Sequence, residues 1–460
     1  LDNTRLMLQI LNTLDILKQV KNNSLKTVNA VFEDYLWTQF FPPMQFAIDT
    51  FDWLKNQVIY SKIANNDNLK NLYIHIPFCK TRCTYCHCYT SLESGDKYKT
   101  YIDYLIKEID QKRKHLWKKI TLDSIFIWWW TPNIIWFKLL EKLLLSISHN
   151  FDISNIQQYN IDLNPYFLDV ETIKVLSNNS VNRCTYAIQS FDREVLRKNS
   201  RYSDINTDHQ KNIQFLQKSG IVVNIDLMVW IKWQTLRTCV SDIDYAHELK
   251  ADNISLNYFI QSSNVHYQID NEHINLINKV KKYYNHTIYN IYNSAENFQE
   301  QHYLNNKVDL IGIWNWSISH VYGEFILYNM WTNEEYYHDL DHNTSKIKKV
   351  KYLSSRDQMI KFIWLNLIYG LDIQKFKEAF WVNILDEFKN EFQFLIIQNI
   401  VKIEGINIKP IVTNLRLYLC LSIFLRDYIP WVEFPHENDF VRKNITKFFL
   451  PTGEKIDEDY

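Results

Sequence analysis

The chain has 460 residues and a formal net charge of −1 at pH 7, so its overall charge does not suggest a nucleic-acid-binding protein. No apolar run reaches the ~18 residues that a membrane helix needs, and the amino terminus lacks the pattern of a signal peptide. The length exceeds that of one ordinary hydrophobic core, and we therefore expect a cytoplasmic protein with a main domain and at least one further domain.

The pattern of apolar residues changes twice along the chain. Residues 1–66 are predicted to form a helical extension, because leucine and isoleucine recur at helical spacing between Leu6 and Leu17. From 67 to 300, short apolar strands alternate with amphipathic helices. From 301 to 460 the pattern is mostly helical. The predicted strands are 72–76, 124–127, 158–163, 183–188, 222–229 and 253–258, and the clearest helices are 98–115, 137–147, 237–249, 357–369 and 373–379.

Alternating strands and helices predict a parallel sheet with right-handed crossovers. Six such units make an α/β fold of the incomplete (β/α)6 barrel type over residues 67–300. Ligands bind at the carboxyl ends of the strands in these folds. Polar residues follow or end four predicted strands in turn, and Asp226 lies within a fifth, which predicts a site at or near one rim: Cys79, Thr131, Asp162, Gln189 and Asp226.

Four cysteines lie within ten residues, and Cys79, Cys83 and Cys86 have the spacing C-x3-C-x2-C. Three thiolates at this spacing can ligate three irons of a cubane [4Fe–4S] cluster and leave the fourth iron open. A disulfide is disfavoured because nothing suggests export, and a zinc site usually needs two ligand pairs. Ligation by Cys88 would close the open iron. We therefore predict Cys79, Cys83 and Cys86 as the cluster ligands.

The residues around these cysteines resemble one family of radical S-adenosylmethionine proteins. Leu72-Tyr-Ile-His-Ile-Pro-Phe-Cys79, followed by Cys83-Thr-Tyr-Cys86, is similar to the anaerobic coproporphyrinogen III oxidases and their heme-chaperone relatives. The resemblance covers about residues 70–400 and implies a [4Fe–4S] cluster, S-adenosylmethionine and a carboxyl-terminal domain that caps the barrel. Further segments match the family in the same order: Asp162-Leu-Asn-Pro165, Arg183 to Phe191, Arg201, and Asp226-Leu-Met-Val ahead of Gln234-Thr235.

The resemblance also implies roles for individual residues. The open iron would bind S-adenosylmethionine, whose reductive cleavage gives a 5′-deoxyadenosyl radical. Gln189, Arg201 and Asp226 match positions that hold a second S-adenosylmethionine in the decarboxylase. Taken singly, Arg201 is better explained as half of a surface ion pair, and Asp162 is compatible with a helix cap; the ordered set of motifs favours the functional interpretation of Asp162. The implied cofactor-binding residues are Tyr73, Tyr85, Trp129, Trp130, Thr131, Asp162, Gln189, Arg201, Asp226 and Ile318.

Two functions follow from the resemblance. The first is an enzyme that oxidatively decarboxylates a propionate of coproporphyrinogen III, and Cys88 favours it. The second is a chaperone that binds heme and the cluster without decarboxylation, which Asp162-Leu-Asn-Pro165 and Gln189-Ser-Phe191 favour. A radical enzyme with another substrate is a third. The implied partners are a tetrapyrrole substrate or heme and an electron donor such as flavodoxin or ferredoxin.

Glycine is scarce, with 7 Gly against 15 Trp, although about 7% of an average protein is glycine. The family's glycine loop reads Trp128-Trp-Trp130, and further family glycines read Trp230, Trp314, Trp316, Trp364 and Trp381. Glycine reaches positive φ and allows close approach to a ligand, whereas tryptophan does neither. Our hypothesis is that UGA, a glycine codon in some bacterial lineages, is written here as tryptophan. The alternative is that some of these are genuine core aromatics.

Overall fold

The structure is a computed structural model that describes residues 48–49, most of 56–258, short stretches within 275–298, most of 307–411, and Phe424. The chain divides into two compact units, which are described separately. One comprises residues 47–259 and 276–352, and the other comprises 1–46, 260–275 and 353–460. Most of the helical extension predicted for residues 1–66 lies outside the described residues; within that range the structure describes a two-residue strand, β1 (Ile48–Asp49), and the helix α3 (Asn56–Asn65).

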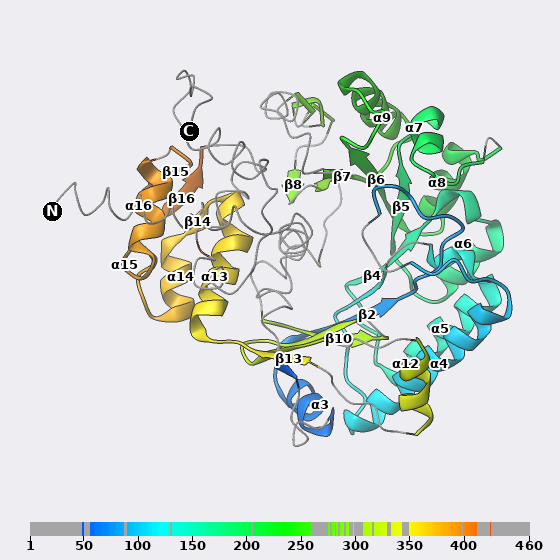
Figure 1. Cartoon of the computed structure of the whole chain (residues 1–460), viewed down its shortest axis with the longest axis horizontal. Coiled ribbons are helices and arrows are strands. Elements are labelled where there is room, and N and C mark those ends of the chain that lie inside the picture. Colours follow the sequence, from blue (N-terminus) through cyan, green and yellow to red (C-terminus); the bar gives the residue numbers. More distant parts are fainter. Residues whose placement is uncertain are drawn as a thin grey trace, which may run out of the picture. The chain divides into compact units, whose positions relative to one another are not determined.

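The larger unit is built on a thirteen-stranded sheet in which seven neighbouring strands run parallel (Figure 1). Six of these are the predicted strands, with ends within three residues of the prediction, and the parallel α/β fold is confirmed. Their apolar side chains, such as Leu72, Ile74 and Ile125, are fully buried. In spatial order the parallel strands are β10 (Val308–Ile313), β2 (Leu69–His75), β3 (Ser124–Trp128), β4 (Gln158–Leu163), β5 (Arg183–Gln189), β6 (Val222–Val229) and β7 (Asn253–Tyr258).

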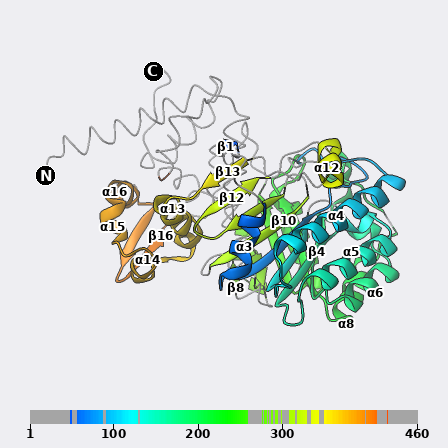
Figure 2. The same cartoon turned by 90° about the horizontal axis from the view of Figure 1, so that it is seen from below.

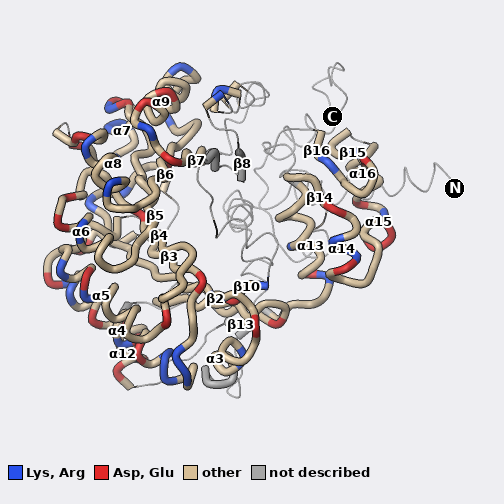
Figure 3. The backbone as a smooth tube through the Cα atoms, turned by 180° about the vertical axis from the view of Figure 1, so that it is seen from behind, with Lys and Arg blue, Asp and Glu red and all other residues tan. Residues whose placement is uncertain are grey.

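Helices connect successive parallel strands, and Figure 2 shows α4, α5, α6 and α8 side by side along the sheet. Their amino termini are set by the sequence: Asp169, Asp192, Asp208 and Thr235 each accept a backbone N–H bond as the N-cap. Both charge signs are mixed along the helices (Figure 3). The helices are α3 (Asn56–Asn65), α4 (Asp96–His115), α5 (Phe137–Asn150), α6 (Val170–Asn178), α7 (Arg193–Lys198), α8 (His209–Lys218) and α9 (Leu236–Glu248).

Antiparallel strands extend both edges of the sheet. The prediction of mostly helical structure after residue 300 is wrong between 308 and 352, where β10 is followed by three short strands and one helix. Strands of four residues are too short for their alternation to stand out in the sequence. These elements are β11 (Ile318–Val321), β12 (Phe325–Tyr328), α12 (Asn333–Asp341) and β13 (Lys349–Tyr352), with β1 (Ile48–Asp49) beside β13 and with β9 (Ile291–Asn293) and β8 (His286–Ile288) beyond β7.

The smaller unit contains the predicted helices near 357–369 and 373–379. A capping box at Ser354 and Asp357 begins the first helix. Fully buried aromatic residues, among them Trp364, Phe376 and Phe388, make its core. Whether this unit caps the barrel stays a prediction. Its elements are α13 (Ser355–Asn366), η6 (Leu367–Tyr369), β14 (Leu371–Asp372), α14 (Ile373–Phe380), α15 (Ile384–Glu387), α16 (Lys389–Ile397), β15 (Val401–Glu404) and β16 (Asn407–Pro410).

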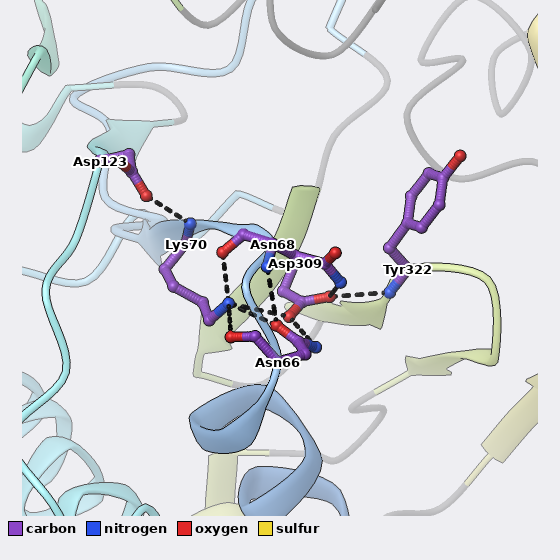
Figure 4. Close-up of polar contacts among 6 residues, drawn as sticks. All are labelled: Asn66, Asn68, Lys70, Asp123, Asp309 and Tyr322. Carbon is purple, nitrogen blue, oxygen red and sulfur yellow. Dashed lines mark hydrogen bonds and ion pairs between the residues drawn. The ribbon is translucent and has the colours of Figure 1, made fainter. Parts of the chain in front are cut away.

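A buried polar cluster joins the amino ends of β2 and β10 (Figure 4). The Asp309 carboxylate accepts bonds from the side-chain amides of Asn66 (2.7 Å) and Asn68 (3.0 Å) and from the backbone N–H of Tyr322 (2.8 Å). The Lys70 ammonium lies 3.4 Å from the same carboxylate and donates to Asn66 Oδ1 at 2.5 Å. These partners satisfy the buried charges, so the cluster is a structural link at the edge opposite the predicted rim.

Candidate functional site

The three predicted cluster ligands lie in the loop that leaves the carboxyl end of β2, and all three are buried. The loop is held where it starts, because the Cys79 N–H donates to the Ser91 carbonyl at 3.0 Å. It then turns, and the Cys86 N–H donates to the Cys83 carbonyl at 3.1 Å. Hydroxyl groups approach two of the sulfurs: Thr131 Oγ1 is 3.5 Å from Cys79 Sγ, and Thr90 Oγ1 is 3.4 Å from Cys86 Sγ. Cys88 lies outside the described residues.

The Arg201 guanidinium is buried beside these sulfurs, and Arg201 Nη2 donates to the Ala187 carbonyl. Burial alone would lower the pKa of Arg201, but Tyr85, Cys83 and Cys79 together raise it above its ordinary value. The guanidinium therefore stays charged and favours negative charge on the Cys79 sulfur. Burial nevertheless raises the pKa of Cys79 to about 12, against the opposing effects of Thr131 and Arg201. Metal coordination is the usual way in which such a buried thiol becomes a thiolate.

Asn199 ties the cysteine loop to two other segments of the rim. Its carbonyl accepts the Thr84 N–H at 3.0 Å, and its Oδ1 accepts the Thr84 hydroxyl at 2.7 Å. Its side-chain Nδ2 donates to the Lys232 carbonyl at 2.8 Å, beyond β6, and to the Val195 carbonyl at 2.9 Å. The fully buried Asn199 therefore fixes the cysteine loop against α7 and against the segment after β6.

The donor set fits a cubane cluster better than a single metal ion. Within the described part of the chain, no three His, Cys, Asp or Glu side chains are placed to hold one ion. A cubane cluster binds each thiolate through a different iron, so its ligands stand further apart than those of a single ion. The three buried thiols of this loop supply the thiolate ligands that such a cluster needs.

The other predicted rim residues lie at the ends of neighbouring strands. Asp162 is buried near the end of β4, and Gln189 ends β5 with a left-handed φ of 74°. Asp226 in β6 accepts a bond from Asn224 Nδ2 at 2.8 Å, and burial raises its pKa to about 6. Non-glycine residues at positive φ are strained and often mark functional positions, which makes Gln189 notable.

Tyr73 lies in β2, and Ile318 begins β11, which is separated from β2 by β10 in the sheet. The Tyr73 hydroxyl is 2.9 Å from His75 Nδ1, and its ring meets the Trp128 ring edge-on at 6.4 Å. Gly312 in β10 pairs with Tyr73 in β2. A Cβ on Gly312 would lie 2.3 Å from the Ile318 carbonyl oxygen, so this close approach requires glycine. Trp129 and Trp130 lie outside the described residues.

The structure thus brings Cys79, Cys83, Tyr85, Thr131 and Arg201 into one group, with Cys86 on the same loop. Asp162, Gln189 and Asp226 lie on the neighbouring strands β4, β5 and β6.

Sequence reasoning missed three residues that shape the rim. His75 is buried beside Tyr73, Asn199 bridges the loops, and Asp242 accepts bonds from Ser190 Oγ (2.7 Å) and the Phe191 N–H (2.8 Å) just after Gln189. Only His75 carried a sequence signal, because it lies within the strand that leads to the cysteines. Among the described residues, no helix combines the length and apolar character needed to cross a membrane.

Comparisons with known proteins identify the superfamily that this part of the chain matches. Residues 73–246 match the family model described as the radical SAM superfamily. The heme chaperone HemW of Lactococcus lactis subsp. lactis is 31% identical over 185 residues, which is 40% of this chain and 47% of the relative. The HemW of Buchnera aphidicola subsp. Acyrthosiphon pisum is 29% identical and covers 53% of this chain and 68% of its own length.

Oxidases are also among the relatives. The oxygen-independent coproporphyrinogen III oxidase of Bradyrhizobium diazoefficiens is 25% identical over 40% of this chain and 42% of its own length. Most of these matches span about half of the curated relatives' length. The solved structure of coproporphyrinogen III oxidase (HemN) from Escherichia coli matches with a TM-score of 0.72 at 17% identity, covering 86% of this chain and 98% of that one.

The structural match shows that the fold is shared, and radical SAM proteins use a [4Fe–4S] cluster and S-adenosylmethionine. Residues 73–246 thus match the radical SAM superfamily, as the cysteine motif predicts, and the chain is similar to heme chaperones and to oxygen-independent coproporphyrinogen III oxidases.

Proposed function

We propose that the chain holds a [4Fe–4S] cluster on Cys79, Cys83 and Cys86, binds S-adenosylmethionine at the same edge, and oxidatively decarboxylates a porphyrinogen propionate. The observation that carries this proposal is the buried group of cysteines with Thr131 and Arg201 at the end of β2. The proposal includes a barrel over residues 67–300, a helical extension before it and a capping domain after it.

The reaction oxidises each propionate by two electrons. One leaves with a proton as an abstracted hydrogen atom, the carboxylate leaves as carbon dioxide, and the remaining electron passes to an acceptor as the vinyl group forms. When bound, the reduced cluster and S-adenosylmethionine supply the radical that abstracts this hydrogen atom. The proposed electron donor is a flavodoxin or a ferredoxin.

The residues of this chain bind and orient the reactants. Arg201 places a buried positive charge beside the sulfurs, which offsets the net negative charge of a thiolate-ligated cluster. Asp162 at the end of β4 is an acceptor for an ammonium or ribose hydroxyl donor when it is ionised. Asp226 is held by Asn224, whose Oδ1 accepts a bond from Ser255 Oγ at 3.1 Å. This chain of bonds fixes the carboxylate before any ligand arrives.

The test is anaerobic turnover of the reconstituted full chain with coproporphyrinogen III, S-adenosylmethionine, a reductant for the cluster and a one-electron acceptor for the substrate radical. A vinyl product with matching amounts of 5′-deoxyadenosine and carbon dioxide is expected. A Cys83→Ser variant should lose all three products, whereas Cys184→Ser, in the core of β5, should keep them. Cleavage of S-adenosylmethionine without vinyl product would contradict the decarboxylase proposal and leave the radical chemistry intact.

A heme chaperone is the second candidate, because a relative at 31% identity bears that name. The Asn164-Pro165 turn after β4 and Phe191 after β5 support it, since both belong to segments that resemble the chaperone branch. The discriminating result is tight heme binding, measured by absorbance titration, in a protein that gives no vinyl product.

A further inference from the structure

Among the described residues, five tryptophans have a left-handed backbone. The φ angles are 52° at Trp117, 70° at Trp230, 73° at Trp233, 96° at Trp314 and 63° at Trp381. Only three other tryptophans fall in the described part of the chain, and none of them has positive φ: Trp128, Trp136 and Trp364. The other five non-glycine residues with positive φ are drawn from all the remaining residue types, so tryptophan is heavily over-represented in this conformation. A Cβ disfavours this conformation, and a bulky side chain makes it rarer still.

Two of these tryptophans follow helices. Trp117 comes directly after the C-cap residue of α4, and its N–H donates to the Lys114 carbonyl at 3.1 Å. Trp381 is the C-cap of α14, with φ 63° and ψ 14°, and its N–H donates to the Lys377 carbonyl at 2.8 Å. Helices commonly end on one left-handed residue, which is usually glycine. In the same unit, Gly370 after η6 shows how this chain uses a genuine glycine, with φ 96°.

The other three lie at the edge of the sheet that carries the cysteines. Trp230 follows β6 directly, Trp233 lies two residues before the N-cap Thr235 of α9, and Trp314 follows β10. Strand ends at such a rim turn sharply toward the site, which is where glycine is favoured.

The indole side chains do not account for this backbone. Trp117, Trp233 and Trp381 are 61%, 63% and 89% exposed. Lysine ammonium groups lie 5.3 Å from the Trp117 ring and 4.6 Å from the Trp233 ring, but exposed contacts of this kind are weak. Trp230 Nε1 is buried with no hydrogen-bond partner, although a buried indole N–H usually has one.

We propose that positions 117, 230, 233, 314 and 381 are glycine in the native protein, inserted at a codon that this sequence writes as tryptophan. The backbone at each position is the one that glycine adopts without strain, and the surrounding elements require it. The inference adds positions 117 and 233, which the family resemblance does not identify as glycines. It leaves Trp364 as an ordinary buried aromatic, because that residue lies within the helix α13.

Glycine in place of tryptophan would also free space at the edge of the sheet that carries the cysteines. The Trp314 indole is fully buried and stacks on the His75 ring at 4.4 Å, and Tyr101 meets it edge-on at 5.4 Å. Glycine at 314 and 230 would remove two indoles from the edge where the cofactor is proposed to bind. The identity of these residues does not depend on the substrate of the protein.

The test is tandem mass spectrometry of the protein isolated from its source cells, with the codons of its gene read in parallel. Glycine fragment masses are expected at all five positions, together with UGA codons. The peptides that contain Gly370 and Gly405 are the matched controls for glycine. Tryptophan masses at Trp233 and Trp381, whose indoles are exposed, would overturn the proposal.

A binding measurement separates this inference from the proposed function. The chain with glycine at the five positions and the chain as written are both reconstituted anaerobically, and S-adenosylmethionine binding is measured by equilibrium dialysis. At least a tenfold gain in affinity is expected for the glycine form. Equal affinities would contradict the inference that these indoles occupy space needed for S-adenosylmethionine. Tight binding without turnover of coproporphyrinogen III would instead contradict the decarboxylase proposal alone.

Discussion

Replacing Trp381 by glycine is expected to stabilise the smaller unit. The indole is 89% exposed, so its removal exposes little apolar surface that is now buried. The left-handed backbone at φ 63° costs a residue with a Cβ about 1–2 kcal/mol. Glycine loses more chain entropy on folding, which offsets about 0.5–1 kcal/mol of the stabilisation gained by removing the Cβ. The net expectation for Trp381→Gly is a gain of about 0.5–1 kcal/mol.

The assay is urea unfolding of the full chain, followed by circular dichroism. With a slope of about 1–3 kcal/mol per molar urea, the midpoint should rise by a few tenths of a molar. Trp381→Ala is the matched control, because it removes the indole and keeps the Cβ, and it should leave the midpoint unchanged. Trp136→Gly is the second control: this residue is 59% exposed with φ −59°, so glycine should bring no gain there. If alanine and glycine at 381 gave the same midpoint, the argument from the left-handed backbone would be refuted.

Three further predictions concern the rim. Cys83→Ser should abolish the visible absorbance of the reconstituted cluster while Cys184→Ser keeps it, and loss in both would point to misfolding instead. Asn199→Ala removes the side-chain bonds that link the cysteine loop to the segment after β6. A chelator should therefore remove iron from the reconstituted cluster several-fold faster. An unchanged rate would show that other contacts hold the loop. Burial raises the pKa values of Asp226 and Asp242 to about 6, above that of an unfolded chain. Both carboxyls therefore bind a proton more tightly when folded, and the free energy of unfolding should fall as pH rises from about 4 to about 6. Asp226→Asn should flatten that slope by about half in pH-dependent urea unfolding, since two similar groups contribute; an unchanged slope would show that Asp226 does not titrate there.

The parallel strands could be predicted from the sequence because each carries its own local signal. Strand β4 and strand β6 are short apolar segments bounded by turns, and both were predicted with their observed ends. The antiparallel strands after β10 could not be predicted in this way. Each has four residues, and pairing with a neighbouring strand rather than local pattern stabilises it.

The residues of the candidate site also fall into two groups: those predictable from local sequence and those that depend on long-range contacts. Cys79, Cys83 and Cys86 carry their chemistry in their spacing, so the sequence alone places them together. Asn199 and Asp242 act through hydrogen bonds to segments that the fold brings from elsewhere, over separations of 33 and 52 residues. Nothing in a single sequence distinguishes such residues from ordinary polar surface positions.

The tryptophans combine a pattern visible in the sequence with a backbone conformation that only the structure shows. At 230 and 314 the sequence shows only that a relative would carry glycine, whereas the structure shows why: both residues leave a parallel strand at the cysteine edge with positive φ. An indole at such a place has to be accommodated by its neighbours, as His75 accommodates Trp314 by stacking. At the exposed Trp381 no neighbour does so, and the backbone is still left-handed. The conformation therefore comes from the helix end and the strand end, and the side chain has no part in setting it.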